Sequence, residues 1–374
     1  MSPPSSFPGP EDHNLPIVCC YGIAWWKRRR IRSFLQRGTR LRFFRSRILA
    51  LFYARRHKGA LAIWASKVTA PFEKMAYKMG VPIVIIEDGF IRSLGLGSGF
   101  LPPCSIIADR QGAYVDPSRP SDLENLLAYK EISPALYSRA QDLICTLQER
   151  HISKYAASAM ATIPLPHPEN CHLILVPGQV AGDLSVIRGG GAITNNLDLL
   201  KAVRHHNPDA WIIYRPHPDV EAGHRSGALS DEITCRYADY IHRGGSITAL
   251  LEEVDEVHTL TSLTGFEALL RGKKVTTYGA PFYAGWGLTT HRGPRLPRRG
   301  RQRDVIELVA ISLILYPLYI NPETNQLCEV EDLIACFDKT HLWEPTMAML
   351  LRKRQGQLRY LLSRFSLVSL FRRV

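Results

Sequence analysis

Short apolar runs alternate with longer segments of mixed polarity along most of the chain, and this alternation predicts strands followed by helices. The apolar runs of the first half occupy residues 17–22, 61–64, 81–86 and 105–109. The run at 81–86 lacks polar alternation, which is typical of a parallel strand buried on both faces. Helices are predicted at 71–79 and over 121–160, where Ser121 and Glu124 form a capping box.

A linker with prolines at 164, 166 and 168 interrupts this series. The alternation then restarts, with strands expected at 173–176, 211–214, 256–259 and 274–278 and helices at 195–205 and 265–271. Two successive strand–helix series predict an α/β fold in which two Rossmann-like lobes with parallel sheets face a central cleft. The expected boundaries are a disordered N-terminus at 1–15, a first lobe at 16–165, a second lobe at 170–335 and C-terminal helices at 336–374.

The composition narrows the choice of partner. The net charge of +13 favours nucleic acid, a sugar nucleotide or the anionic cytoplasmic face of a membrane. No recognised nucleic-acid-binding module is present, so nucleic acid is not expected. The eight cysteines form no C-x-x-C pair and have no histidines at zinc spacing, so we expect reduced thiols and no metal. Without a signal-peptide pattern or an apolar run of ~20 residues, we expect a cytoplasmic protein.

Two acidic residues, Glu87 and Asp88, follow the buried strand at 81–86 and precede Gly89. The carboxyl ends of strands are where open α/β sheets bind their ligands. A carboxylate there can act as a general base toward a hydroxyl or as a nucleophile toward an anomeric carbon. Gly89 would let the backbone turn sharply and approach a ligand. The alternative is an acidic turn that only ends the strand.

A rigid histidine follows the strand at 211–214. His217 lies between Pro216 and Pro218, which restrict the backbone, and Arg215 precedes them. Arginine and histidine both donate hydrogen bonds to anionic oxygen, so the pattern suits a phosphate site. An ordinary surface turn is the alternative.

Hydroxyl side chains follow the strand at 256–259 and precede a helix. Amides at a helix start together with Ser and Thr hydroxyls form an anion site, and a simple N-cap is the alternative. Glu267 would repel a phosphate and is expected to bind sugar or ribose hydroxyls, while Gln179, in the loop after 173–176, is a candidate for reading a base or sugar edge. The glycine-rich segments at 95–99 and 189–191 lack the spacing of dinucleotide or P-loop motifs and are interpreted as flexible loops near the cleft.

Four longer strings carry these motifs, at 87–97, 214–220, 258–272 and 281–289. Together they resemble the capsular polysaccharide β-Kdo transferases of the KpsC/LipB type, over about residues 21–335, with one module where the family usually has two in tandem. (Kdo is 3-deoxy-D-manno-oct-2-ulosonic acid.) The resemblance implies a GT-B glycosyltransferase that moves Kdo from CMP-Kdo to a (lyso)phospholipid-linked or Kdo-terminated acceptor, building the β-Kdo linker of capsular polysaccharide. A β-linked product from a β-configured donor implies retention.

The same resemblance implies roles for individual residues. The catalytic carboxylate is Asp88, with Glu87 as the alternative. The donor-binding residues are Gln179, Arg215, His217, Pro218, Thr261, Ser262, Thr264, Gly265 and Glu267. Acceptor or sugar contacts are expected from Trp25, Lys27, Arg92 and Ser93. No cofactor and no metal are expected beyond the donor substrate.

The C-terminal segment 349–374 mixes leucine, phenylalanine and valine with arginine and lysine and has no acidic residue. This pattern suits a helix lying on an anionic bilayer, although a terminal helix packed across the two lobes is the alternative. We therefore expect a cytoplasmic enzyme that is peripheral on the inner membrane. A second Kdo transferase or capsule assembly proteins are further expected partners.

Two other functions remain open at this point. A transferase for CMP-sialic acid or another CMP-ulosonic acid shares the short motifs, and only the longer strings argue against it. A basic scaffold protein of the capsule export machinery would explain the net charge of +13. It would leave the motifs at the strand ends unexplained.

Overall fold

The computed structural model describes residues 15–36, 38, 40–94, 101–154, 165–223, 225–344 and 350. The chain forms two compact units, each assembled from separate stretches of sequence. The first comprises Met1–Arg92, Pro102–Glu131 and Val309–Leu342, and the second comprises Ser93–Leu101, Ile132–Leu308 and Trp343–Val374. The glycine-rich segment at 95–99, the N-terminal residues 1–14 and nearly all of the C-terminal segment 349–374 lie outside the described residues.

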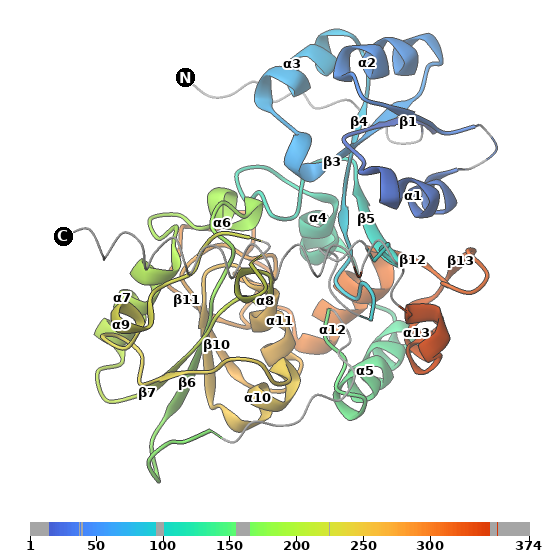
Figure 1. Cartoon of the computed structure of the whole chain (residues 1–374). Coiled ribbons are helices and arrows are strands. Elements are labelled where there is room, and N and C mark those ends of the chain that lie inside the picture. The colour runs from blue at the N-terminus through green and yellow to red at the C-terminus, as the bar shows by residue number, and fades with distance from the viewer. Residues whose placement is uncertain are drawn as a thin grey trace. The chain divides into compact units, whose positions relative to one another are not determined.

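The first unit is built on a seven-stranded sheet with the order β13-β12-β5-β4-β3-β1-β2 (Figure 1). Its strands are β1 (Ile17–Tyr21), β2 (Arg42–Phe44), β3 (Ala60–Trp64), β4 (Ile83–Asp88), β5 (Ser105–Asp109), β12 (Leu318–Ile320) and β13 (Leu327–Cys328). Strands β1 to β4 are parallel, as predicted, but β5 is antiparallel to β4 and β12 is antiparallel to β5. The expectation of a purely parallel sheet is therefore wrong here, because a strand buried on both faces has the same apolar pattern in either direction.

Helices cover both faces of this sheet, with α2 and α3 on one side of β1 and β3 and α1 on the other (Figure 1). The helices of the unit are α1 (Arg28–Leu35), α2 (Arg47–Arg56), α3 (Ala70–Lys78), α4 (Asp122–Tyr129) and α13 (Val330–Ala335). Ile31 and Phe34 of α1 pack with Cys20, Ala62 and Ile86 of the sheet in one buried cluster. The capping of α4 by Ser121 agrees with the prediction, since its hydroxyl accepts a hydrogen bond from the Glu124 amide.

The second unit is built on a six-stranded sheet with the order β11-β10-β9-β6-β7-β8. Its strands are β6 (Leu173–Pro177), β7 (Trp211–Arg215), β8 (Tyr240–Ile241), β9 (Glu256–Thr259), β10 (Lys274–Thr277) and β11 (Thr290–His291). Every pairing in it is parallel, as predicted. Its helices are α5 (Pro134–Glu149), α6 (Leu184–Gly189), α7 (Asn196–His206), α8 (Pro218–Glu221), α9 (Asp231–Thr234), α10 (Ile247–Glu253) and α11 (Leu263–Leu269), and α12 (Val305–Val309) leads back to the first unit.

The unit boundaries differ from those expected from the sequence in two places. Residues 309–335 were assigned to the second lobe, but β12 and β13 lie in the sheet of the first unit. Helix α5 was assigned to the first lobe, but it belongs to the second unit, where Tyr137 donates a hydrogen bond of 3.0 Å to Asp304. Sequence order alone misplaces both segments, because strand pairing decides where β12 and β13 lie and tertiary contacts decide where α5 packs.

Candidate functional site

Each unit contains a topological switch point, where consecutive strands lie on opposite sides of the first strand. In the first unit the chain passes from β1 to β2 on one side and continues in β3 on the other. In the second, β6 is flanked by β7 on one side and β9 on the other. Ligands of open α/β sheets bind outside the carboxyl ends of the strands at such points. The residues singled out in the sequence lie at the carboxyl ends of strands at or next to both switch points.

In the first unit two cations hold the carboxylate of Asp88, the last residue of β4. The Lys27 Nζ lies 3.1 Å from Oδ1, and the Arg92 Nε lies 2.9 Å from Oδ2. Both oxygens of the carboxylate are therefore paired with a positive charge. Lys27 reaches this position because η2 (Trp25–Lys27) follows β1 at the switch point. The arrangement fixes the orientation of Asp88 and favours its anionic form.

Lys27 is itself held on an aromatic face. Its Nζ lies 3.6 Å from the centroid of the Trp64 ring, at the end of β3, a distance that allows a cation–π interaction. Burial lowers the pKa of Lys27, while the neighbouring Asp88 opposes this shift. Trp64 is not among the site residues predicted from the sequence. Its place at the end of a predicted strand was the available clue.

The other member of the acidic pair has a different environment. The carboxylate of Glu87 accepts a hydrogen bond of 3.0 Å from the Asp88 amide. Gly89 is required for packing, because a Cβ at this position would lie 2.2 Å from the Ser105 hydroxyl oxygen of β5. The close approach that Gly89 permits is therefore to a neighbouring strand, whereas the sequence analysis expected a ligand.

Three of the four expected acceptor contacts are buried. Arg92 and Ser93 are completely buried, and the Arg92 guanidinium is directed to Asp88. Lys27 is also buried. Trp25, in contrast, exposes 70% of its surface. Arg92 and Lys27 thus act as positioning groups for Asp88 in this structure.

In the second unit a hydrogen-bonded bridge spans the switch point between β6 and β9. The Gln179 amide group donates a hydrogen bond of 2.9 Å to the Thr261 hydroxyl and accepts one of 3.0 Å from the Thr261 backbone amide. The Thr261 hydroxyl also contacts the Ser185 hydroxyl at 3.1 Å. Asn196 binds the backbone of Gln179 at both its N–H and its C=O, each at 2.8 Å. Gln179 therefore joins two loops, and the sequence analysis missed Ser185 and Asn196.

The start of α11 follows the same loop. The Ser262 hydroxyl accepts a hydrogen bond of 3.2 Å from the Thr264 amide and contacts the Thr264 hydroxyl at 3.1 Å. This is the N-cap that the sequence analysis considered as the simpler alternative. Gly265 is required because a Cβ would lie 2.3 Å from the Tyr283 hydroxyl oxygen. In this arrangement the Ser262 hydroxyl donates to the Thr264 hydroxyl, and both lie at the carboxyl end of β9.

Glu267 lies one turn into α11 and is buried. Its carboxylate accepts a hydrogen bond of 2.9 Å from the Lys154 backbone amide. Burial raises the pKa of Glu267, and the Lys154 amide and Arg271 oppose this effect. The Glu267 carboxylate therefore has a hydrogen-bond partner inside the protein. The prediction that it binds sugar or ribose hydroxyls did not include this contact.

The His217 ring has a defined orientation. It caps α8, and its Nδ1 accepts a hydrogen bond of 3.1 Å from the Asp219 amide. The contact assigns the proton of the neutral ring to Nε2, which remains as a donor. Burial lowers the pKa of His217, while the acidic Asp219 and Asp183 oppose this shift. His217 is therefore suited to donate one neutral hydrogen bond, with Pro218 holding the first turn of α8.

Arg215, at the end of β7, is engaged within the protein. Its Nη2 donates a hydrogen bond of 2.8 Å to the Gly245 carbonyl, and its Nη1 lies 3.0 Å from the His242 Nδ1. Burial lowers the pKa of Arg215. Arg215 anchors the loop that follows β8, which limits how many hydrogen bonds it can offer to a phosphate.

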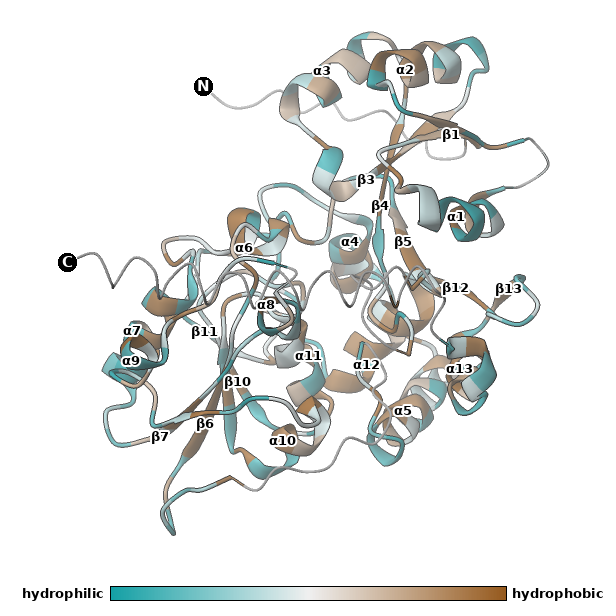
Figure 2. Ribbon diagram, viewed as in Figure 1, coloured by the Kyte–Doolittle hydropathy of each residue, from teal (hydrophilic) through white to brown (hydrophobic). Residues whose placement is uncertain are grey.

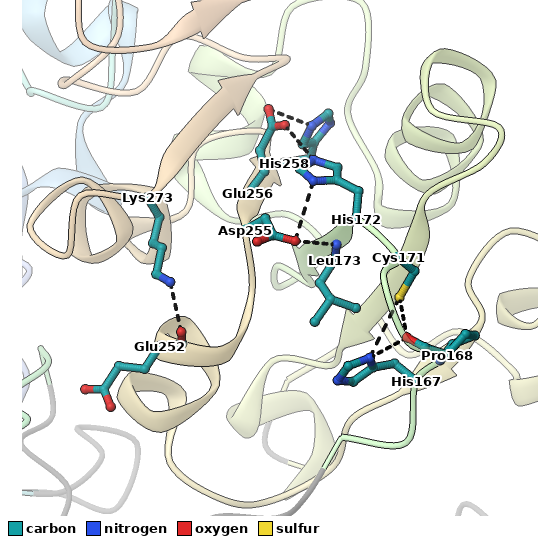
Figure 3. A network of polar contacts seen from close by, with 10 residues as sticks. All are labelled: His167, Pro168, Cys171, His172, Leu173, Glu252, Asp255, Glu256, His258 and Lys273. Atoms are coloured by element: carbon teal, nitrogen blue, oxygen red, sulfur yellow. Dashed lines mark hydrogen bonds and ion pairs between the residues drawn. The ribbon is translucent and has the colours of Figure 1, made fainter.

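A separate polar network occupies the amino ends of β6 and β9, at the opposite edge of the sheet (Figure 3). The Glu256 carboxylate lies 2.9 Å from the His258 Nε2 and 3.4 Å from the His172 Nε2, and it accepts a hydrogen bond of 2.6 Å from Thr276. Burial disfavours the ionised form of Glu256, but the hydrogen bonds from His258 and Thr276 outweigh it and lower its pKa to about 2. The network lies at the amino ends of these strands and is separate from the candidate site at their carboxyl ends.

Comparison with known proteins gives consistent matches. The family model described as "Capsule polysaccharide biosynthesis protein" matches residues 60–321. The capsule polysaccharide modification protein LipA of Neisseria meningitidis serogroup B is 42% identical over 313 residues, which are 83% of this chain and 44% of LipA. The lipopolysaccharide-processing protein LpsZ of Rhizobium meliloti is 35% identical over 325 residues, which are 85% of this chain and 73% of LpsZ. The chain therefore spans about half the length of LipA.

Two solved structures from Thermosulfurimonas dismutans are similar along most of the chain. The KpsC β-Kdo 2,7 transferase has a TM-score of 0.72 and 35% identity, covering 88% of this chain and all of that one. The KpsC β-Kdo 2,4 transferase has a TM-score of 0.71 and 32% identity, covering 89% of this chain and 99% of that one. The resemblance noted from the sequence strings is thereby confirmed in three dimensions.

Proposed function

The chain belongs to the family of capsule polysaccharide biosynthesis proteins, and from this premise we propose that it is a glycosyltransferase that moves Kdo from CMP-Kdo. The observation that carries the proposal is the 35% identity to a β-Kdo 2,7 transferase over that protein's full length. The acceptor is a (lyso)phospholipid-linked or Kdo-terminated glycan, and the product is the β-Kdo linker of capsular polysaccharide. We propose a GT-B fold with two Rossmann-like lobes.

Asp88 is the proposed nucleophile of a two-step reaction. In the first step a carboxylate oxygen of Asp88 attacks C2 of Kdo, the bond from C2 to the phosphate oxygen breaks, and CMP leaves with that electron pair. In the second step an acceptor hydroxyl oxygen attacks C2, and the bond to Asp88 breaks. The hydroxyl proton passes to a base, for which Glu87 is the neighbouring candidate. Two displacements at C2 give retention.

Lys27 and Arg92 support this role by keeping Asp88 anionic and fixed in direction. Their contacts to separate oxygens, at 3.1 and 2.9 Å, oppose protonation of the carboxylate. Holding a nucleophile in one geometry lowers the entropic part of the barrier. Arg92 is completely buried, so its charge is poorly screened by water.

The second unit is the proposed CMP site. The Nε2–H of His217 and the hydroxyls of Ser262 and Thr264 are assigned to the donor phosphate, and no metal is required in this scheme. Gln179 and Thr261 are proposed to hold the two loops of this site together, since their amide and hydroxyl groups are hydrogen-bonded to each other. The C-terminal segment 349–374 is proposed to attach the enzyme to the inner membrane, with a second Kdo transferase or capsule assembly proteins as partners.

The test is a donor comparison with the full chain. The protein is incubated with CMP-Kdo, with CMP-sialic acid or with no donor, together with a Kdo-terminated lipid acceptor, and the release of CMP and the product mass are followed. CMP release and a Kdo-sized mass increase only with CMP-Kdo are expected, and EDTA should leave both unchanged. Transfer from CMP-sialic acid instead would identify the related CMP-ulosonic acid transferase. Release from neither donor, with intact CMP binding, would favour a scaffold in capsule export.

A further inference from the structure

Helix α2 exposes a compact apolar face. Ile48, Leu49 and Phe52 expose 50%, 59% and 59% of their surfaces. Phe52 follows Ile48 by four residues and Leu49 by three, so the three side chains lie on one side of the helix. We propose that this face, defined by Ile48, Leu49 and Phe52, docks the first unit on an anionic lipid bilayer.

The apolar face is a stable part of the fold. The opposite side of α2 buries Ala50, Leu51 and Ala54 completely. The helix starts at a capped end, where the Ser46 hydroxyl accepts a hydrogen bond of 3.4 Å from the Leu49 amide. Because one side is packed and the start is capped, the exposed side chains are presented in a fixed orientation.

Positive charge surrounds this face. Arg45, Arg47, Arg55, Arg56 and Lys58 are all exposed. Arg45 and Arg47 precede the apolar residues in the sequence, and Arg55, Arg56 and Lys58 follow them. Cations therefore lie at both ends of the apolar face. Figure 2 shows hydrophobic and hydrophilic segments of α2 next to each other. An exposed apolar patch with cations at its border suits the interface of an anionic bilayer.

The charge of the chain is concentrated in this part of the sequence. Residues 13–72 contain fourteen lysines and arginines and no acidic residue. The net charge of the whole chain is +13, so the residues outside 13–72 sum to −1 (13 minus 14). Residues 13–72 include the whole of α2 (Arg47–Arg56), so positive charge is dense in the sequence around the apolar face, and this charge complements anionic lipid headgroups.

Apolar side chains and arginines next to each other on one helix favour a bilayer over other partners. Nucleic acid would bind the cations, but its phosphates would not bury the three neighbouring apolar side chains on this helix face. A second copy of this chain would bring fourteen further positive charges from its own residues 13–72 against the first set. A bilayer with anionic headgroups accepts both the apolar side chains and the arginines. The inference does not depend on the C-terminal segment or on the donor specificity proposed above.

The test is co-sedimentation of the full chain with vesicles of phosphatidylethanolamine and phosphatidylglycerol, compared with vesicles of phosphatidylcholine. Two double variants test the apolar and the electrostatic contributions to vesicle binding. Leu49→Ser with Phe52→Ser removes apolar side chains, and Arg55→Glu with Arg56→Glu reverses two positive charges. Each is expected to lower the partition coefficient for the anionic vesicles by about tenfold. The charge variant should also reduce the difference between the two lipid compositions.

Matched controls change similar side chains on the second unit. Ile187→Ser removes an apolar side chain of α6 that is 63% exposed, and Arg236→Glu with Lys274→Glu reverses two exposed charges. These variants should bind vesicles as the unmodified chain does. Circular dichroism and thermal melting establish that all variants are folded. Unchanged vesicle binding of both folded α2 variants would overturn the proposal, as would a dimer in light scattering that Phe52→Ser dissociates without affecting vesicle binding.

Discussion

The two switch points of this molecule have the same topology and opposite chemistry. In the first unit the carboxyl ends of the strands bring together a carboxylate and two buried cations, Asp88, Lys27 and Arg92. In the second unit, between β6 and β9, neutral amide and hydroxyl groups are hydrogen-bonded to one another, with Gln179 and Thr261 at the centre. The same position in two sheets thus provides a fixed charge in one case and a set of neutral donors in the other.

The difference suggests separate functions for the two switch points. Burying a charge costs desolvation energy, which pairing can offset, and both oxygens of Asp88 are paired with a cation. Neutral donors at a strand end suit a ligand that brings its own negative charge. The first switch point is therefore the proposed place of bond formation, and the second the proposed place of donor binding. Four substitutions test this comparison.

The largest effect is expected at Asp88. Asp88→Asn removes the nucleophile but keeps the side-chain volume, so transfer should fall by about a thousandfold or more. CMP binding, measured by calorimetry, should remain unchanged because the donor site is proposed for the other unit. Glu87→Gln is the companion variant. Near-normal turnover of Asp88→Asn together with an inactive Glu87→Gln would assign the chemistry to Glu87.

A smaller loss is expected from Lys27→Met, which removes one of the two cations at Asp88 while keeping the length of the side chain. The Asp88 carboxylate then keeps only Arg92, and kcat should fall by about 10- to 100-fold through loss of positioning. The KM for the donor should change little. Lys67→Met, a lysine in η3 (Ala65–Lys67) after β3, serves as the control. A change in donor KM with unchanged kcat would show that Lys27 binds substrate instead.

His217→Ala should affect binding and not the chemical step. Loss of one hydrogen bond to a charged phosphate weakens CMP affinity by about tenfold. His217→Gln, whose amide is also a donor, should restore part of that affinity. Turnover at saturating donor should stay close to that of the unmodified chain. A loss of turnover with unchanged CMP affinity would reverse the roles assigned to the two switch points.

The smallest effect is expected at the bridge between the loops. Thr261→Val removes the hydroxyl that contacts Gln179 and Ser185, and unfolding should become easier by about 1 kcal/mol. Thermal melting measures this change, and CMP affinity should fall only a few-fold. Thr146→Val, whose hydroxyl donates to a carbonyl of its own helix, is a suitable control. Tenfold or greater loss of CMP affinity would mean that Thr261 contacts the donor directly.

More of the candidate site could be predicted from the sequence than of the residues that contact it. The strands that end at Asp88 and Arg215, the N-cap at Ser262 and the rigid setting of His217 all follow from local patterns. Trp64, Ser185 and Asn196 were not found, because their contacts join segments that are distant in the sequence. The burial of Arg92 was also hidden, since an arginine after an acidic turn has the same local pattern whether it faces solvent or a carboxylate.

What the sequence alone determined is the alternation of strands and helices, the parallel sheet of the second unit and the strand-end position of each candidate residue. These properties depend on neighbours within a few residues, such as apolar runs, caps and prolines. Only the tertiary structure decided the direction of β5, the return of β12 and β13 to the first sheet, and the pairing of Lys27 and Arg92 with Asp88. Strand pairing and ion pairing depend on which distant segments meet, and no local pattern encodes that choice.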